Sequence, residues 1–179
     1  MPSTTPRRAW LARAIGLAAA AALPTRPALA NELKLGAAAP PLVLHTLDGR
    51  AIATRDLLGQ VVIVNFWATW CAPCLEEMPQ LSAYAQSRAG QGLQVLGFSL
   101  DDAAALSKVK AIAASLHYPV GLLGGAYAGG YGRVWRCPVS FVIDRDGRLV
   151  HDGWKDDTNT PWTKAQFARV VDPVLQRKG

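Results

Sequence analysis

The chain has 179 residues, 50% of them hydrophobic and 18% charged, with three cysteines and a formal net charge of +6. This length suits one domain with a buried core. Residues 1–30 hold four of the 19 Lys and Arg and none of the 13 acids, so the rest of the chain carries only about +2. No basic run and no basic-aromatic pattern remains there, which argues against nucleic-acid binding.

Residues 1–30 follow the pattern of a signal peptide. They begin with a basic segment containing Arg7-Arg8, continue through an apolar core at 14–23 and end in Ala28-Leu29-Ala30. The core is too short to span a bilayer, which takes about 20 apolar residues. The sequence therefore predicts a cleaved export signal, with a twin-arginine signal as one reading, and a periplasmic domain at 31–179. An uncleaved membrane anchor is the alternative.

The first elements expected in the domain are two short strands. Leu42 to His45 and Arg50 to Ala53 flank an Asp48-Gly49 turn, which predicts a β-hairpin. Arg55 to Leu58 then predicts a short turn before the central part of the chain.

The segment that follows carries the strongest pattern. Val61 to Trp67 is short, β-branched and aromatic, which predicts a fully buried parallel strand. Cys71 to Ser87 has apolar residues at helical spacing, so a helix is expected to begin at the two cysteines. Side chains three residues apart share a helix face, and the thiols of Cys71 and Cys74 should therefore lie together at the helix start.

The chain then alternates between strand and helix. Leu93 to Leu100 predicts a strand, and Asp101-Asp102 predicts the cap of a helix that runs to about Leu116. This alternation predicts a parallel sheet. A short apolar segment from Tyr118 to Leu123 follows, and Gly124 to Gly132 predicts a loose helix or a surface loop.

The last part of the chain predicts an antiparallel edge and a closing helix. Val139 to Asp144 and Leu149 to Gly153 read as strands joined by a turn at Arg145 to Arg148, where Gly147 can take a positive φ. Trp162 to Gln176 reads as an amphipathic helix whose end is bent or frayed by an internal proline.

The chemistry of this pattern depends on the two cysteines of the C-A-P-C turn. Only a thiolate attacks a disulfide, and the free N–H groups and dipole at a helix start favour the anion. The outer Cys71 is therefore expected to be the nucleophile and Cys74 to resolve the mixed disulfide, with no cofactor beyond the redox-active disulfide Cys71–Cys74. A zinc site needs four ligands, but only one further cysteine and three unpaired histidines exist. A purely structural disulfide would close too small a loop to stabilise much.

The run F-W-A-T-W-C-A-P-C-L-E-E-M-P resembles the active site of thioredoxin-fold proteins, and more narrowly the TlpA/ResA/CcmG group of exported reductases. The resemblance covers nearly all of residues 36–179. It implies an α/β, thioredoxin-like three-layer fold, with a central mixed sheet, helices on both faces and an N-terminal β-hairpin extension. We expect a monomer that reduces client proteins, such as apocytochrome c thiols or copper-site cysteines, and receives electrons from a membrane thiol-disulfide transporter.

The resemblance also assigns residues around the dithiol. Glu77 matches the acid that the TlpA-like group uses as proton acceptor, whereas Asn65 stands where ordinary thioredoxins carry a buried acid. Pro138 matches the cis-proline that faces the dithiol. The backbone of Cys137 is expected to pair with a substrate chain, and Trp70 to form an apolar wall beside an exposed thiol.

Cys137 departs from the family pattern, in which the residue before the cis-proline is not a cysteine. Three interpretations of Cys137 stay open: an inert buried side chain, a thiol that attacks Cys71 in a disulfide, or the third ligand of a Cu(I) site. Apart from this third interpretation, no metal is expected. The alternative function is a Sco-type copper metallochaperone that uses Cys71, Cys74 and a histidine, although Sco-type proteins carry CxxxC. A peroxiredoxin is disfavoured because its P-x-x-x-T-x-x-C arrangement is absent.

Overall fold

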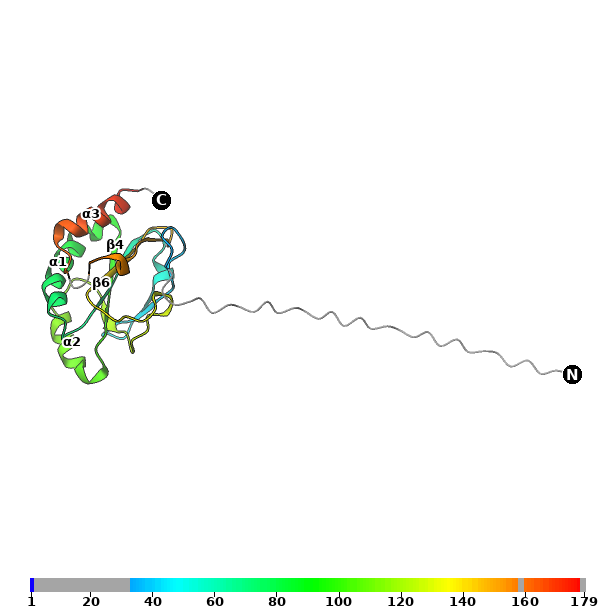
Figure 1. Ribbon diagram of the computed structural model, residues 1–179, viewed down its shortest axis with the longest axis horizontal. Helices are drawn as coiled ribbons and strands as arrows, with labels where there is room; N and C mark the ends of the chain where they lie inside the picture. The colour runs from blue at the N-terminus through cyan, green and yellow to red at the C-terminus, as the bar shows by residue number, and fades with distance from the viewer. Residues whose placement is uncertain (2–32, 158–159, 178–179) are drawn as a thin grey trace.

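The computed structural model describes Met1 and residues 33–157 and 160–177, so all of the predicted signal at 1–30 except Met1 lies outside the described residues. Its centre is a five-stranded sheet with the order β5-β4-β3-β6-β7 (Figure 1). β3 pairs in parallel with β4, and β4 pairs in parallel with β5. On the other side of β3, β6 pairs antiparallel with β3, and β7 pairs antiparallel with β6. The predicted mixed sheet is confirmed. Its strands are β3 (Val61–Trp67), β4 (Leu93–Ser99), β5 (Val120–Leu122), β6 (Val139–Ile143) and β7 (Leu149–His151).

The α-helices of the described residues cover one face of the sheet (Figure 1). Their buried side chains share one core with Val61, Ile63 and Trp67, which alternate along β3. The α-helices are α1 (Ala72–Arg88), α2 (Leu106–Ala113) and α3 (Lys164–Leu175). No helix of the described residues is long and apolar enough to cross a membrane.

The opposite face has a second core around Val62, Val64 and Phe66. The three-layer fold is confirmed, but the helices on this face are short 3₁₀ turns instead of α-helices: η4 and η5 contribute Tyr131 and Trp154 to the core. The 3₁₀ segments of the chain are η1 (Thr54–Leu57), η2 (Ala89–Gln91), η3 (Ala103–Ala105), η4 (Gly129–Tyr131) and η5 (Gly153–Lys155).

The N-terminal hairpin is present as a separate two-stranded sheet, β1 (Val43–His45) and β2 (Ala51–Ala53). It attaches to the outer strand β5, where the Leu47 amide donates to the Val120 carbonyl at 2.9 Å. The backbones are so close that a Cβ at Gly121 would collide with the His45 carbonyl oxygen. The hairpin therefore helps to close the second core, in which Leu44 is fully buried.

Two helices differ from the prediction, and the different start of each affects the site. Asp102 alone caps the turn η3, accepting from the Ala104 and Ala105 amides, and α2 ends at Ala113 before the predicted Leu116. The last helix begins at Lys164 with Thr163 as its N-cap, so Trp162 lies in the preceding loop. Asp101 and the Trp162 amide therefore lie outside these helices, and both form hydrogen bonds near the dithiol.

Candidate active site

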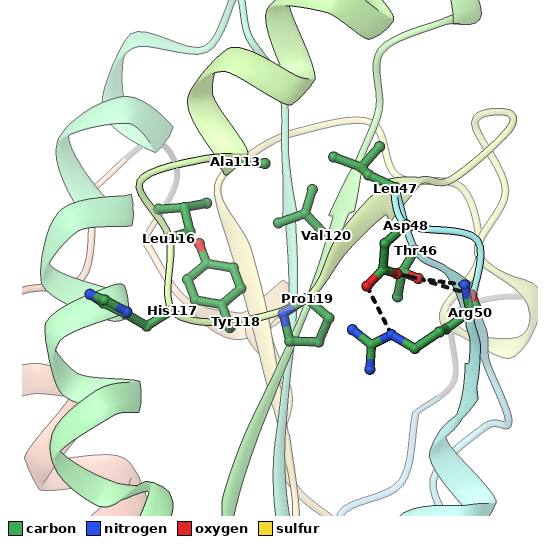
Figure 2. A pocket seen from close by; sticks show the side chains of 10 residues that line it. All are labelled: Thr46, Leu47, Asp48, Arg50, Ala113, Leu116, His117, Tyr118, Pro119 and Val120. Carbon is green, nitrogen blue, oxygen red and sulfur yellow. Dashed lines mark hydrogen bonds and ion pairs between the residues drawn. The ribbon is translucent and has the colours of Figure 1, made fainter.

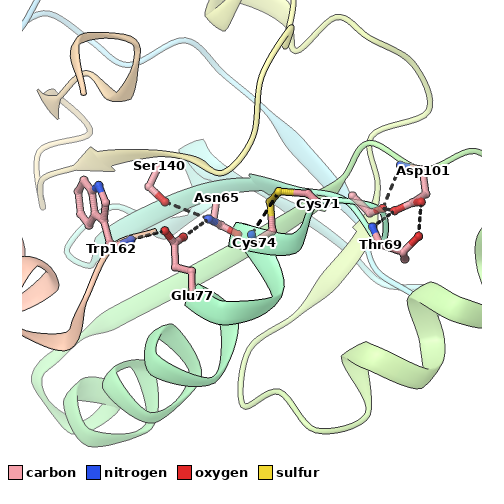
Figure 3. Close-up of a disulfide and its surroundings, with 9 residues drawn as sticks. Asn65, Thr69, Cys71, Cys74, Glu77, Asp101, Ser140 and Trp162 are labelled. Atoms are coloured by element: carbon pink, nitrogen blue, oxygen red, sulfur yellow. Dashed lines mark hydrogen bonds between the residues drawn. A yellow bond between two sulfur atoms is a disulfide. The ribbon is translucent and has the colours of Figure 1, made fainter. Parts of the chain in front are cut away.

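The dithiol lies at the N-terminus of α1, as the sequence predicts (Figure 3). Cys71 is the N-cap residue, and its Sγ accepts from the Cys74 amide at 3.2 Å. The two sulfurs form a disulfide in this structure. Cys71 is 5% exposed and Cys74 1%, so Cys71 is the more accessible of the two, although the exposed thiol expected beside Trp70 is in fact largely buried. Unpaired amides at the helix start can stabilise a thiolate on Cys71.

Glu77 is buried one turn of α1 beyond Cys74, with only 2% of its surface exposed. Its Oε1 accepts from Asn65 Nδ2 at 3.0 Å, and its Oε2 accepts from the Trp162 amide at 2.7 Å. Burial raises the pKa of Glu77 to about 7 against the opposing effect of these two donors, and the negative charge of Asp156 adds to the increase. Near neutral pH this carboxylate can therefore both accept and release a proton.

The side-chain amide of Asn65 can form a hydrogen bond with Glu77 in either protonation state of the carboxyl group. Its Nδ2 also donates to Ser140 Oγ at 3.0 Å, while its Oδ1 is buried without a hydrogen-bond partner. A rotated amide would present Oδ1 to a protonated Glu77 and to the Ser140 hydroxyl, because a hydroxyl can donate as well as accept. Asn65, at the position where ordinary thioredoxins carry a buried acid, is thus a hydrogen-bond partner of Glu77 in this structure.

Asp101 fixes the turn that precedes the dithiol, a contact that the sequence analysis missed. Its carboxylate accepts from the Thr69 amide at 2.8 Å, the Thr69 hydroxyl at 2.7 Å and the Ser99 hydroxyl at 2.7 Å. Burial works to raise the pKa of Asp101, but the hydrogen bonds from Ser99 and Thr69 together hold it below its ordinary value. A charged carboxylate thus anchors Thr69, two residues before Cys71, to the end of β4 (Figure 3).

Cys137 lies beside the disulfide, as one of the sequence hypotheses required. The Cys137–Pro138 bond is cis, and the sulfurs of Cys71, Cys74 and Cys137 all lie within 4.8 Å of one another. Burial raises the pKa of the Cys137 thiol to about 11, and the charge of Asp101 acts in the same direction. At neutral pH Cys137 is therefore a protonated thiol, which is a poor nucleophile toward Cys71.

A groove opens beside the dithiol. Trp70, 68% exposed, forms one wall, and Trp135, 63% exposed, lines it as well. The groove has a volume of about 530 Å³, and the segment 124–126 also lines it. Asp101 and Asp102 contribute acidic groups to its lining. Exposed aromatic side chains next to a reactive pair can hold an extended polypeptide. The predicted position of Trp70 agrees with this arrangement, and Trp135 was not singled out from the sequence.

A second hollow has a volume of about 370 Å³. It lies between the turn of the β1–β2 hairpin and the segment that leads from α2 into β5 (Figure 2). Asp48 and Arg50 lie on one side of it and pair with each other at 2.9 Å. His117 and Tyr118 lie on the other side. Neither Cys71, Cys74, Glu77 nor Cys137 lines this hollow.

No histidine joins the sulfur cluster within residues 33–157 and 160–177. The third donor beside Cys71 and Cys74 is Cys137, and no His, Asp or Glu of this part of the chain completes a four-ligand set around them. The histidine expected by the Sco-type alternative is thus replaced by a cysteine. A tetrahedral zinc site lacks its fourth protein ligand here.

Comparisons with known proteins agree with this geometry. A model of the AhpC/TSA family matches residues 35–152. A protein of Bacillus anthracis named thiol-disulfide oxidoreductase ResA is 34% identical over 121 residues, which make up 67% of this chain and 69% of the relative. A solved thiol:disulfide interchange protein of the thioredoxin family from Chlorobium tepidum TLS superposes with a TM-score of 0.64 at 29% identity, covering 80% of this chain and 99% of that one. A second Chlorobium tepidum structure, described as thiol:disulfide interchange protein DsbE, gives a TM-score of 0.65 at 26% identity with the same coverage.

Proposed function

The chain belongs to the AhpC/TSA family of thioredoxin-fold proteins and is a thiol-disulfide oxidoreductase, and from this premise we propose that it is an exported reductant of client proteins. The observation that carries the proposal is the buried dithiol with the buried Glu77 one turn of α1 beyond its inner cysteine. A pKa of about 7 lets Glu77 take up the proton that Cys74 must lose in order to release a reduced client. Export rests on the signal pattern of residues 1–30.

The reaction consists of two exchanges. The Cys71 thiolate attacks one sulfur of a client disulfide, so that a mixed disulfide forms and the second client sulfur leaves as a thiolate. Glu77 then accepts the proton of Cys74, and the Cys74 thiolate attacks the sulfur of Cys71. The first client sulfur leaves as a thiolate, and the chain is left with the Cys71–Cys74 disulfide, which is the state of this structure. A membrane thiol-disulfide transporter is proposed to return two electrons, with protons taken up from solvent.

The clients are proposed to be extended segments carrying two cysteines, either apocytochrome c haem-attachment sites or copper-site cysteines awaiting metal. The groove next to the dithiol supports this proposal, because Trp70 and Trp135 offer apolar surface and Asp102 offers a negative charge. An extended segment can lie there with its disulfide close to Cys71. The backbone of Cys137 and the cis Pro138 are proposed to pair with the same segment, and the protein is proposed to act as a monomer.

Trp70→Ala is expected to lower kcat/KM for an oxidised peptide with the C-x-x-C-H haem-attachment motif by about tenfold, mostly through KM, because about 1 to 2 kcal/mol of aromatic contact is lost. Reduction of the peptide by the pre-reduced chain is followed by alkylation and mass spectrometry. Tyr127→Ala is the matched control, since Tyr127 is also 68% exposed and does not line the groove. Equal losses of kcat/KM in the two variants would show that the groove does not bind the client. Failure of the wild type to reduce the peptide would reject this client class.

A further inference from the structure

The sulfur cluster of Cys71, Cys74 and Cys137 holds more thiols than disulfide exchange requires. Two cysteines complete the reaction, yet the third sulfur lies within 4.8 Å of both of them. All three side chains are buried, at 5%, 1% and 5% exposure. Cys71 and Cys74 come from the start of α1, whereas Cys137 comes from the loop before β6, so two distant parts of the chain meet at this point.

We propose that the reduced chain binds one Cu(I) ion through the thiolates of Cys71, Cys74 and Cys137. The donor set consists of sulfur only, and soft thiolates favour Cu(I) over hard cations. A metal bound at about 2.3 Å to three sulfurs in one plane sets those sulfurs about 4 Å apart. The observed limit of 4.8 Å already approaches that separation, so small side-chain adjustments after reduction of the disulfide suffice.

The surroundings suit a soft ion with few ligands. No His, Asp or Glu of the described segments supplies a fourth donor to the cluster, a deficit that disfavours tetrahedral Zn²⁺ and leaves the coordination trigonal. The Cys74 amide already donates to Cys71 Sγ at 3.2 Å, and the start of α1 offsets part of the negative charge of the thiolates. Burial of the sulfurs limits access of water and of competing ligands.

Redox state decides whether the site exists. Reduction of the Cys71–Cys74 disulfide by an external dithiol or phosphine takes two electrons and two protons and provides two of the three thiols. Cu(I) then displaces protons from the thiols without any change in its own oxidation state. Disulfide formation and Cu(I) binding exclude each other, because the sulfurs that bind the ion are the ones that become oxidised.

The test is an anaerobic titration of phosphine-reduced, desalted protein with Cu(I), in competition with the chromophoric chelator bathocuproine disulfonate. One ion per chain is expected, and Cys137→Ser, checked for its fold by circular dichroism, is expected to bind at least tenfold more weakly. X-ray absorption should find three sulfur neighbours around copper in the wild type and two in the variant. The oxidised wild type is the control for surface binding and should bind no Cu(I) in the presence of the chelator.

The site would be disproved by equal affinities of wild type and Cys137→Ser, or by two sulfur neighbours in the wild type. The absorption measurement on the wild type decides the question even where the variant fails to fold. Binding of Cu(I) by the oxidised chain would also reject the site, because that form lacks two of its ligands. None of these outcomes depends on whether the chain reduces client disulfides, because the phosphine reduces the Cys71–Cys74 disulfide in this test. The Cu(I) site and the proposed reductase function can therefore fail separately.

Discussion

Cys71→Ser is expected to reduce disulfide reduction to the background rate of the assay, because the attacking thiolate is lost and Cys74 is almost completely enclosed. A serine hydroxyl at the N-cap can still accept the Cys74 amide, so the helix start should be retained. The assay follows reduction of a peptide disulfide by pre-reduced protein. Residual activity above one tenth of the wild type would show that Cys74 or Cys137 can start the reaction.

Cys74→Ser is expected to stop the reaction one step later, with the client attached to Cys71 as a stable mixed disulfide. Peptide mapping by mass spectrometry identifies the linked cysteine. Cys137 lies close enough to complicate this trap, although its raised pKa of about 11 makes it slow to attack at neutral pH. The double variant Cys74→Ser/Cys137→Ser is therefore the control, and its trapped complex should live about as long as that of the single variant. A client linked to Cys74 in the wild type would reverse the assignment of nucleophile and resolving cysteine.

Glu77→Gln is expected to slow the release of a mixed disulfide at pH 7 by about 100-fold and to remove an inflection near pH 7 from the rate profile, because the proton acceptor for Cys74 is gone. Single-turnover release of a peptide, followed by tryptophan fluorescence from pH 5 to 9, measures both effects. The variant should fold, since the introduced side-chain amide can accept from the Trp162 amide and donate to a rotated Asn65. The exposed neighbour provides the matched control, Glu76→Gln, which should behave like the wild type.

Glu77→Gln is also expected to change how the free energy of unfolding depends on pH. Since folding raises the pKa of Glu77 from 4.5 to about 7, the folded state holds a proton that the unfolded state loses above pH 4.5. The contribution of this bound proton to the free energy of unfolding is complete below pH 4.5 and is lost as the pH rises through 7. The free energy of unfolding of the wild type should therefore decrease by about 3 kcal/mol at most over this range. Urea unfolding of oxidised Glu77→Gln between pH 4.5 and 8 should lack this decrease. Parallel stability curves for the variant and the wild type would make Glu77 an ordinary structural side chain.

The parts of the fold that could be predicted depend on local patterns. The apolar segment Val61 to Trp67, the turn at Asp48-Gly49 and the C-A-P-C helix start each carry their signal within a few neighbouring residues, and all three are found where expected. The family resemblance supplied the fold class, which the named relatives confirm. Local patterns do not determine which face a helix covers. The sequence therefore did not show that, within the described residues, the helical segments on the second face are short 3₁₀ turns.

The contacts that complete the site connect residues far apart in the chain. Asp101 looked like a helix cap because an acid before an apolar segment is the usual cap signal, but it bonds Thr69, 32 positions away. Trp162 looked like a helix residue, yet its amide donates to Glu77, 85 positions away. No spacing rule links such pairs. The proximity of Cys137 to the dithiol likewise depends on the geometry of the loop before β6. The resemblance at Pro138 predicted only that this loop faces the dithiol.

The central claim, that this dithiol donates electrons to clients, is tested most directly by the equilibrium reduction potential of the Cys71–Cys74 pair. The chain with residues 1–30 removed is equilibrated at pH 7 in dithiothreitol or glutathione buffers of graded ratio, and the fraction reduced is measured by alkylation and mass spectrometry. A reductant requires a potential near that of thioredoxin, about −270 mV. Every 30 mV corresponds to about 1.4 kcal/mol, so the two ends of the scale are well separated. A value near −120 mV, at the end of the strong oxidants, would contradict the account and make the chain a donor of disulfides.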